Sequence, residues 1–99
     1  MGFKVIVSSR AQKELVKGID YYALNSNDAP KNFITAVENA YSILAKDPFL
    51  RIRYKNVRAL KIRRFPYLLY FVINENAQRV KILSCFHIKR NPESRPRFG

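Results

Sequence analysis

The spacing of apolar residues changes once along this chain, and that change limits the possible folds more than any other feature. Between residues 9 and 46, apolar side chains recur every three or four positions, which is the period of a helix buried on one side. From residue 57 onward, apolar and polar side chains alternate, which is the period of a strand. With 99 residues in this order, we expect one α+β domain spanning residues 1–99.

The first half of the chain predicts a strand and then two helices. Residues 3–7 are apolar enough for a short strand, and Ser9 with Gln12 has the spacing of a capping box at a helix start. Asp28 can cap the second helix. Because the connection at 25–27 is short, we expect an antiparallel helical hairpin. The apolar stripes are Ala11, Leu15, Ile19 and Tyr22, and then Phe33, Val37, Ala40, Tyr41 and Leu44.

The second half predicts three further strands. Segment 57–63 alternates, with Leu60 and Ile62 facing the core, and residues 67–73 are apolar on both faces, as is typical of a central strand. Segment 79–87 alternates again. The expected order is β-α-α-β-β-β, with the helical hairpin packed on a small, mostly antiparallel sheet. The position of the first strand in that sheet stays open.

Basic residues are concentrated in the second half. Of the net charge of +12, all but one unit lies in residues 51–99, and segment 51–64 holds seven bases and no acid. Repulsion between like charges is therefore uncompensated inside this segment. An anionic nucleic acid or an acidic protein would relieve it, and the alternative is a solvated face without a partner. From about residue 89 to 99 we expect an irregular basic tail.

Strand parity predicts one basic face. Lys61 and Arg63 alternate with core residues, while Arg79, Lys81 and His87 share a parity in the last strand. We expect such a face to contact phosphates or a target protein. The candidate binding residues are Arg51, Arg53, Lys55, Arg58, Lys61, Arg63, Arg79, Lys81, Lys89 and Arg90.

His87 is the only histidine and the only candidate for acid–base chemistry near neutral pH. In RNA cleavage it could move a proton while Lys61, Arg63 and Arg64 stabilise the phosphate charge. The alternative is a histidine at a strand end that hydrogen-bonds to the tail. Because the basic half has only two acids and the chain has three scattered glycines, we expect no metal site, no phosphate-binding loop and no cofactor.

The remaining polar and aromatic candidates favour structural roles. Cys85 has no nucleophile motif around it and is expected as a packed thiol. Tyr70 is expected in the core, while Tyr54 and Tyr67 could pack or stack on bases. The longest apolar run, residues 68–73, is far too short to span a membrane, and we expect a cytoplasmic protein.

Residues 57–71 and 87–92, with residues 8–11 and 20–22 in the first half, resemble the RelE/ParE superfamily of bacterial toxins. The resemblance covers nearly the whole chain and includes the element order. It implies the toxin of a type II toxin–antitoxin module, bound by a cognate antitoxin that covers helices and a sheet edge. Acidic antitoxin segments would neutralise the basic half. The resemblance leaves the oligomeric state open.

The superfamily contains two mechanisms. RelE-like members cut mRNA on the ribosome without a metal, and ParE-like members inhibit DNA gyrase. Lys61, Arg63 and Arg64 match the basic strand positions of the nucleases, and His87 matches the end of their last strand. Because Ile88 follows and the tail has no tyrosine, the resemblance favours a ParE-like gyrase inhibitor. The alternatives are a RelE-like endoribonuclease and a non-toxic basic module that binds nucleic acid or protein.

Overall fold

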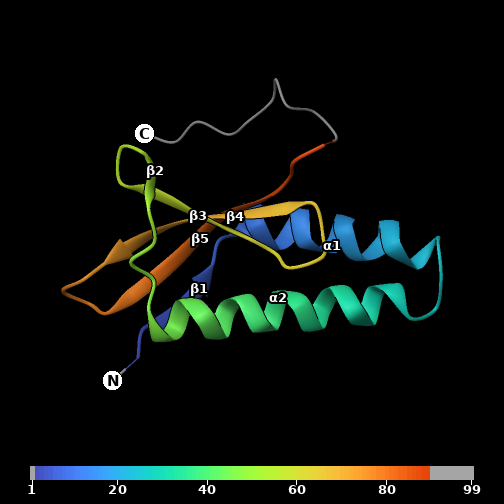
Figure 1. Cartoon of the computed structure of the whole chain (residues 1–99), viewed down its shortest axis with the longest axis horizontal. Coiled ribbons are helices and arrows are strands. Elements are labelled where there is room, and N and C mark those ends of the chain that lie inside the picture. The colour runs from blue at the N-terminus through green and yellow to red at the C-terminus, as the bar shows by residue number, and fades with distance from the viewer. Residues whose placement is uncertain (1, 90–99) are drawn as a thin grey trace.

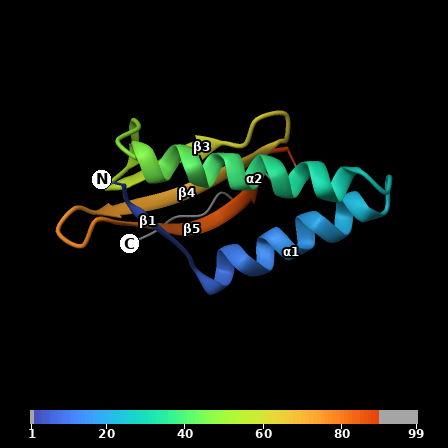
Figure 2. The same ribbon diagram turned by 90° about the horizontal axis from the view of Figure 1, so that it is seen from below.

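The computed structural model describes residues 2–89, which form a helical layer on one face of a five-stranded sheet (Figures 1 and 2). The α+β class and the helical hairpin expected from the sequence are confirmed. Most of the expected tail, residues 90–99, lies outside the described residues. The elements are β1 (Lys4–Val7), α1 (Ser9–Ala23), α2 (Ala29–Lys46), β2 (Ile52–Tyr54), β3 (Val57–Lys61), β4 (Tyr67–Asn74) and β5 (Arg79–His87).

The sheet has the strand order β1-β5-β4-β3-β2 and is antiparallel except at one edge. There β1 runs parallel to β5, which places the strand that the sequence left open. At the other edge, β2 is a strand that the sequence did not predict. Its three residues are all exposed, so they show no burial pattern. A tight turn with Lys55 at a positive φ of 52° returns the chain into β3.

The helix starts differ in detail from the predicted caps. Ser8, one residue before the predicted Ser9, caps α1, and its Oγ accepts a hydrogen bond from the backbone N–H of Ala11. Gln12 does not complete a capping box, because its amide donates to the Val7 carbonyl. At α2, Asp28 is the N-cap without a side-chain bond, and the hydroxyl of Ser26 accepts from Ala29 instead.

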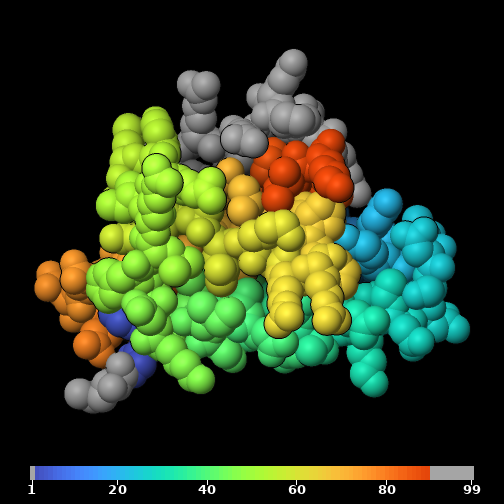
Figure 3. Space-filling view, viewed as in Figure 1, coloured from blue at the N-terminus to red at the C-terminus, as the bar shows by residue number. Residues whose placement is uncertain are grey.

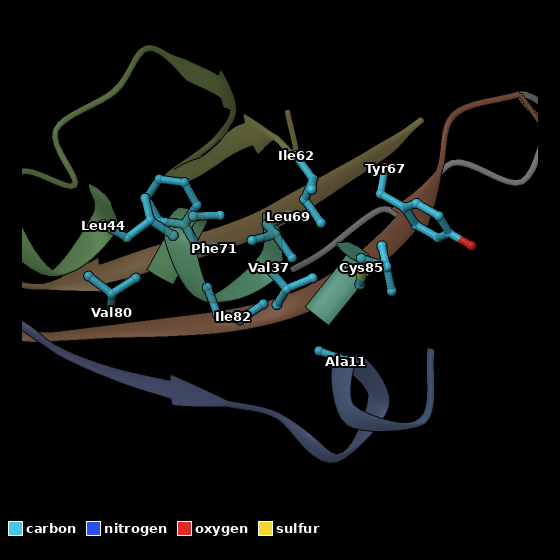
Figure 4. Close-up of a cluster of buried hydrophobic side chains, with 12 residues drawn as sticks. Ala11, Val37, Leu44, Ile62, Tyr67, Leu69, Phe71, Val80, Ile82 and Cys85 are labelled. Carbon is cyan, nitrogen blue, oxygen red and sulfur yellow. The ribbon is translucent and has the colours of Figure 1, made fainter. Parts of the chain in front are cut away.

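The core lies between the helical layer and the inner face of the sheet (Figure 4). Both sides of this interface carry the residues that the apolar periodicity predicted, and burial of their apolar surface is the main force that joins the two layers. On the helices the buried residues are Ala11, Phe33, Val37, Ala40 and Leu44, and on the strands they include Ile62, Tyr67, Leu69, Phe71, Val80, Ile82 and Cys85.

A β-bulge in β5 changes the side-chain parity of that strand. Tyr70 pairs with Ser84, but the next residue, Phe71, pairs with Ile82, so Leu83 is an extra residue. Beyond the bulge, His87 pairs with Tyr67, which belongs to the helix-facing core. The prediction that His87 shares a face with the two bases at the start of this strand was therefore wrong.

The same bulge displaces Phe86. It pairs with Leu68 on the face away from the helices, whereas strict alternation along segment 79–87 would place it with Val80 and Ile82 in the core. A sequence read with a strict period of two cannot register an inserted residue, because the insertion is visible only against the partner strand.

Two side chains from the start of the helical layer hold the bulge. The Ser8 hydroxyl donates to the Leu83 carbonyl at 3.1 Å. The Oε1 atom of Glu14 accepts from the Ser84 hydroxyl at 2.7 Å and from the Cys85 backbone N–H at 3.1 Å. Ser84 is fully buried, so Glu14 supplies a hydrogen-bond partner to a group that water cannot reach.

Glu14→Ala is expected to lower the free energy of unfolding by about 1–3 kcal/mol, because it leaves the buried Ser84 hydroxyl without its acceptor. Urea unfolding at neutral pH measures the change. Glu14→Gln keeps an acceptor oxygen and should cost less than Glu14→Ala, whereas Glu38→Ala, at an exposed position of α2, should stay within about 0.5 kcal/mol of wild type. Equal losses of unfolding free energy in Glu14→Ala and Glu38→Ala would contradict the role of Glu14 as the hydrogen-bond acceptor at the bulge.

Candidate target-binding surface

Charge is separated between the two layers of the fold. Residues 8–47, which form the helical layer, carry five bases and five acids. The rest of the described chain, which forms the sheet and its connections, carries eleven bases and a single acid, Glu75. The imbalance seen along the sequence is therefore an imbalance across the molecule.

Five of these bases form a surface that we call the basic face, on the side of the sheet away from the helices. Lys4 pairs with Arg79, and Lys81 pairs with Val72 and Ile6, all with a parity opposite to the core residues. The other two, Arg51 and Arg53, line a hollow of about 540 Å³ together with Ala59. The basic face thus consists of Lys4, Arg51, Arg53, Arg79 and Lys81. Among residues 2–89, none of the five side chains has a hydrogen-bond or ion-pair partner.

Three other predicted bases lie at a separate place, around the turn between β3 and β4. Lys61, Arg63 and Arg64 line a groove of about 740 Å³ whose other wall is α2, with Asn39 and the half-exposed Ile43. Figure 3 shows side chains of this turn, in yellow, reaching over α2. Arg64 adopts a positive φ of 71° within the turn.

Lys61 was predicted to point away from the core, and its parity agrees. Its ammonium, however, bends to the turn and donates to the carbonyls of Ile62 and Phe65 at 3.3 and 3.2 Å. Lys61 therefore closes the turn and does not extend the basic face.

The side chains of two predicted binding residues contact nearby parts of the same chain. Arg58 lies on the helix side, where its Nε donates to the Leu50 carbonyl at 2.7 Å and its guanidinium stacks over the Phe49 ring. Lys55 sits at the tip of the β2–β3 turn with its ammonium 5.5 Å from the centre of the Tyr54 ring. Tyr54 is exposed there, so it does not join the core.

His87 lies at the edge of the helix-facing side. Its ring meets the Tyr67 ring edge-on, with the centroids 4.9 Å apart, and both line a pocket of about 180 Å³ with Glu14 and Lys17 of α1. Tyr67 itself is buried, which answers the question left open by the sequence in favour of packing. The only candidate acid–base group is thus on the opposite side of the sheet from Arg79 and Lys81.

Among residues 2–89, the remaining candidate residues show no sign of a reactive side chain or a metal site. Cys85 is a buried thiol, as predicted, and burial raises its pKa to about 12, so it stays protonated and unreactive at neutral pH. Burial also raises the pKa of Tyr41 to about 12. Within the described part of the chain, no three His, Cys, Asp or Glu side chains gather as a metal site would require. No described helix is long and apolar enough to cross a membrane.

Lys4 and Glu14 are the residues that sequence reasoning missed. Lys4 reaches the basic face because β1 pairs in parallel with a strand 75 positions away, and no local pattern indicates that register. Glu14 looks like an ordinary surface residue of an amphipathic helix. Lys89 is exposed just beyond β5, and Arg90 lies outside the described residues.

Two solved structures with the same fold come from toxin–antitoxin systems. One, from the chromosomal ParDE system of P. aeruginosa, has a TM-score of 0.63 at 17% identity, covering 86% of this chain and 95% of that one. Another, from the RelBE2 complex of Mycobacterium tuberculosis, has a TM-score of 0.62 at 23% identity, covering 88% and 99%. A search of curated proteins found no match.

Membership of a family comes from the sequence model of the ParE toxin of the type II toxin–antitoxin system parDE, which matches residues 5–92. The match includes both helices and all five strands except Lys4, the first residue of β1, and it agrees with the resemblance drawn from residues 57–71 and 87–92. The chain therefore belongs to the ParE family of type II toxin–antitoxin toxins.

Proposed function

We propose that this toxin inhibits DNA gyrase by binding it, with no chemistry of its own, and that a cognate antitoxin blocks this activity. The observation that carries the proposal is the match of residues 5–92 to the ParE toxin model, and the position of His87 supports it. His87 faces the helical layer, whereas Arg79 and Lys81 are on the opposite face of the sheet and cannot share a phosphate with it. The β3–β4 turn, which carries Arg63, lies beside the end of β5, where the Pro66 carbonyl accepts from the backbone N–H of Ile88. A metal-free nuclease needs its proton donor and its cations around one phosphate.

A cognate antitoxin fits the surface of the described chain. Large apolar side chains are exposed on both helices, at Val16, Tyr21, Ile34 and Ile43 among others. Such side chains on a helix face suit an amphipathic partner helix. Acidic residues in that partner would also lower the repulsion among the bases of the sheet layer.

The test is a supercoiling assay with purified gyrase and the purified toxin. We expect wild type to inhibit supercoiling, and His87→Ala to inhibit it equally, because His87 contributes no chemistry in a binding inhibitor. Adding the cognate antitoxin should restore supercoiling. Unchanged supercoiling at a stoichiometric excess of folded wild-type toxin would overturn the proposal.

The RelE-like alternative predicts a different result in a parallel assay. Purified toxin would then cleave mRNA on translating ribosomes, and His87→Ala would abolish the cleavage. We expect intact mRNA with both proteins.

A further inference from the structure

We infer that the basic face binds the phosphate backbone of duplex DNA, independently of gyrase. This binding activity goes beyond the proposed inhibition, since it needs no second protein. Binding to DNA would also bring the toxin to the polymer on which gyrase, its proposed target, acts.

The first support is the local electrostatics of β1 and β5. Lys4 is directly opposite Arg79 on the neighbouring strand, and Lys81 is two residues along on the same face. Strand geometry puts such positions roughly 5–7 Å apart. The residues paired with Arg79 and Lys81 on β4 are Asn74 and Val72, so no carboxylate lies opposite either base.

The second support is the lack of intramolecular compensation. Surface bases normally stand among acids, and Arg10 on α1 has Glu14 within 3.8 Å. Within residues 2–89, the five bases of the basic face have no such partner, and the single acid of this layer, Glu75, is in the β4–β5 turn. Repeated anionic groups at the spacing of a nucleic-acid backbone would relieve this repulsion.

The composition of the face favours a nucleic acid over an acidic protein. Protein interfaces have an apolar centre with aromatic anchors. Among the described residues, the large exposed hydrophobic side chains lie on the helices and between Phe49 and Tyr54, and none lies on β1, β4 or β5. Around Lys4, Arg79 and Lys81 the face has bases without exposed apolar anchors, which suits contacts to phosphates that position a protein without reading sequence. The exposed Ile52 lies only at the other edge, between Arg51 and Arg53.

The aromatic residues favour a duplex over a single strand. Proteins that bind single strands stack the bases on exposed aromatic rings. On this face Phe86 is buried and Tyr70 is half-buried, with their rings tilted against each other at 6.3 Å. The Tyr54 ring is exposed, and the Lys55 ammonium lies 5.5 Å from its centre. Unstacked bases would therefore find little to stack on.

The experiment measures binding of the full-length toxin to a short fluorescent DNA duplex of random sequence, by anisotropy over a series of salt concentrations. We expect binding that weakens steeply as salt rises. The test variant is Lys4→Ala/Arg79→Ala/Lys81→Ala, and the matched control is Lys13→Ala/Lys17→Ala/Lys31→Ala on the helical layer. Both variants lose the same net charge, and circular dichroism confirms that each is folded.

The two variants should separate clearly. The sheet variant should bind the duplex at least about tenfold more weakly than wild type. The slope of its log binding constant against log salt concentration should fall in magnitude by about 0.9 for each phosphate that it no longer neutralises. The helix variant should keep the wild-type slope and stay within about twofold in affinity. Because gyrase is absent, a failure here leaves the proposed inhibition standing, and the reverse also holds.

Three results would overturn the inference. One is the absence of duplex binding at low salt. Another is an equal loss of affinity in both triple variants, which would reflect net charge alone. The third is preference for another anion: tighter binding to a single-stranded RNA of equal charge, or full displacement of the duplex by polyglutamate at equal charge, which would assign the face to an acidic protein.

Discussion

Phe33→Ala is expected to lower the free energy of unfolding by about 3–5 kcal/mol, the largest loss from any single truncation that we predict. Phe33 is fully buried at the centre of the contact between α1, α2 and the sheet. Its ring lies 5.2 Å from the Tyr22 ring, 5.2 Å from the Phe65 ring and 5.1 Å from the Tyr67 ring. Removing it leaves a cavity and also ends these aromatic contacts.

The surroundings of Phe33 cannot close that cavity easily. Its ring packs directly on Gly18 of α1, where even an added Cβ would meet ring atoms at 3.0 and 3.2 Å. Gly18 therefore sets the close approach of the two helices, and the glycine that weakens α1 locally is required by the packing. Because a small domain has about 5–15 kcal/mol of stability in total, Phe33→Ala should lose a large part of its stability.

Ile34→Ala is the matched control for this prediction. Ile34 is the next residue of α2, but it is 41% exposed and faces away from the core. Its truncation should cost about 1 kcal/mol or less. Urea unfolding followed by circular dichroism compares the two variants, and similar midpoints for both would refute the central role of Phe33.

Local periodicity predicted the two-layer fold because burial itself is periodic. The stripe from Phe33 to Leu44 and the alternation around Leu60 and Ile62 each describe one buried face, and the structure joins those faces into one core. The α+β class, the helical hairpin and the mostly antiparallel sheet all follow from them. No long-range information was needed for that part.

The arrangement of the candidate site depended on contacts that local patterns do not contain. The bulge at Leu83 separates His87 from Lys81, and it exists only relative to β4. Lys4 joins the basic face through the parallel register with β5. Lys61 has the predicted parity, but carbonyls of the next turn hold its ammonium. Charge composition thus indicated that bases gather in the sheet layer, while the residues of the basic face had to come from the strand pairing.

Expression of the wild-type toxin alone in bacteria should arrest growth with relaxed plasmid DNA and intact mRNA, and co-expression of the neighbouring antitoxin gene should restore growth. The decisive variant is Arg63→Ala/His87→Ala. A ribonuclease would lose its proton-transfer group and a phosphate-binding cation together, with a fall in activity of at least about a hundredfold. In the fold Arg63 lines the groove along α2 and His87 packs beside Tyr67, and the proposed inhibition by binding needs no proton transfer from His87. We therefore expect the double variant to remain as toxic as wild type.

Colony counts, RNA integrity and plasmid topology after induction measure this prediction together. Phe33→Ala serves as the control for lost stability, because a smaller folded fraction should weaken growth arrest by any mechanism. Loss of toxicity in a double variant that still folds, with cleaved mRNA in cells expressing wild type, would replace the gyrase proposal with the nuclease. Retained toxicity with relaxed plasmids and intact mRNA would support inhibition by binding, since growth arrest would then persist without the only histidine of the chain.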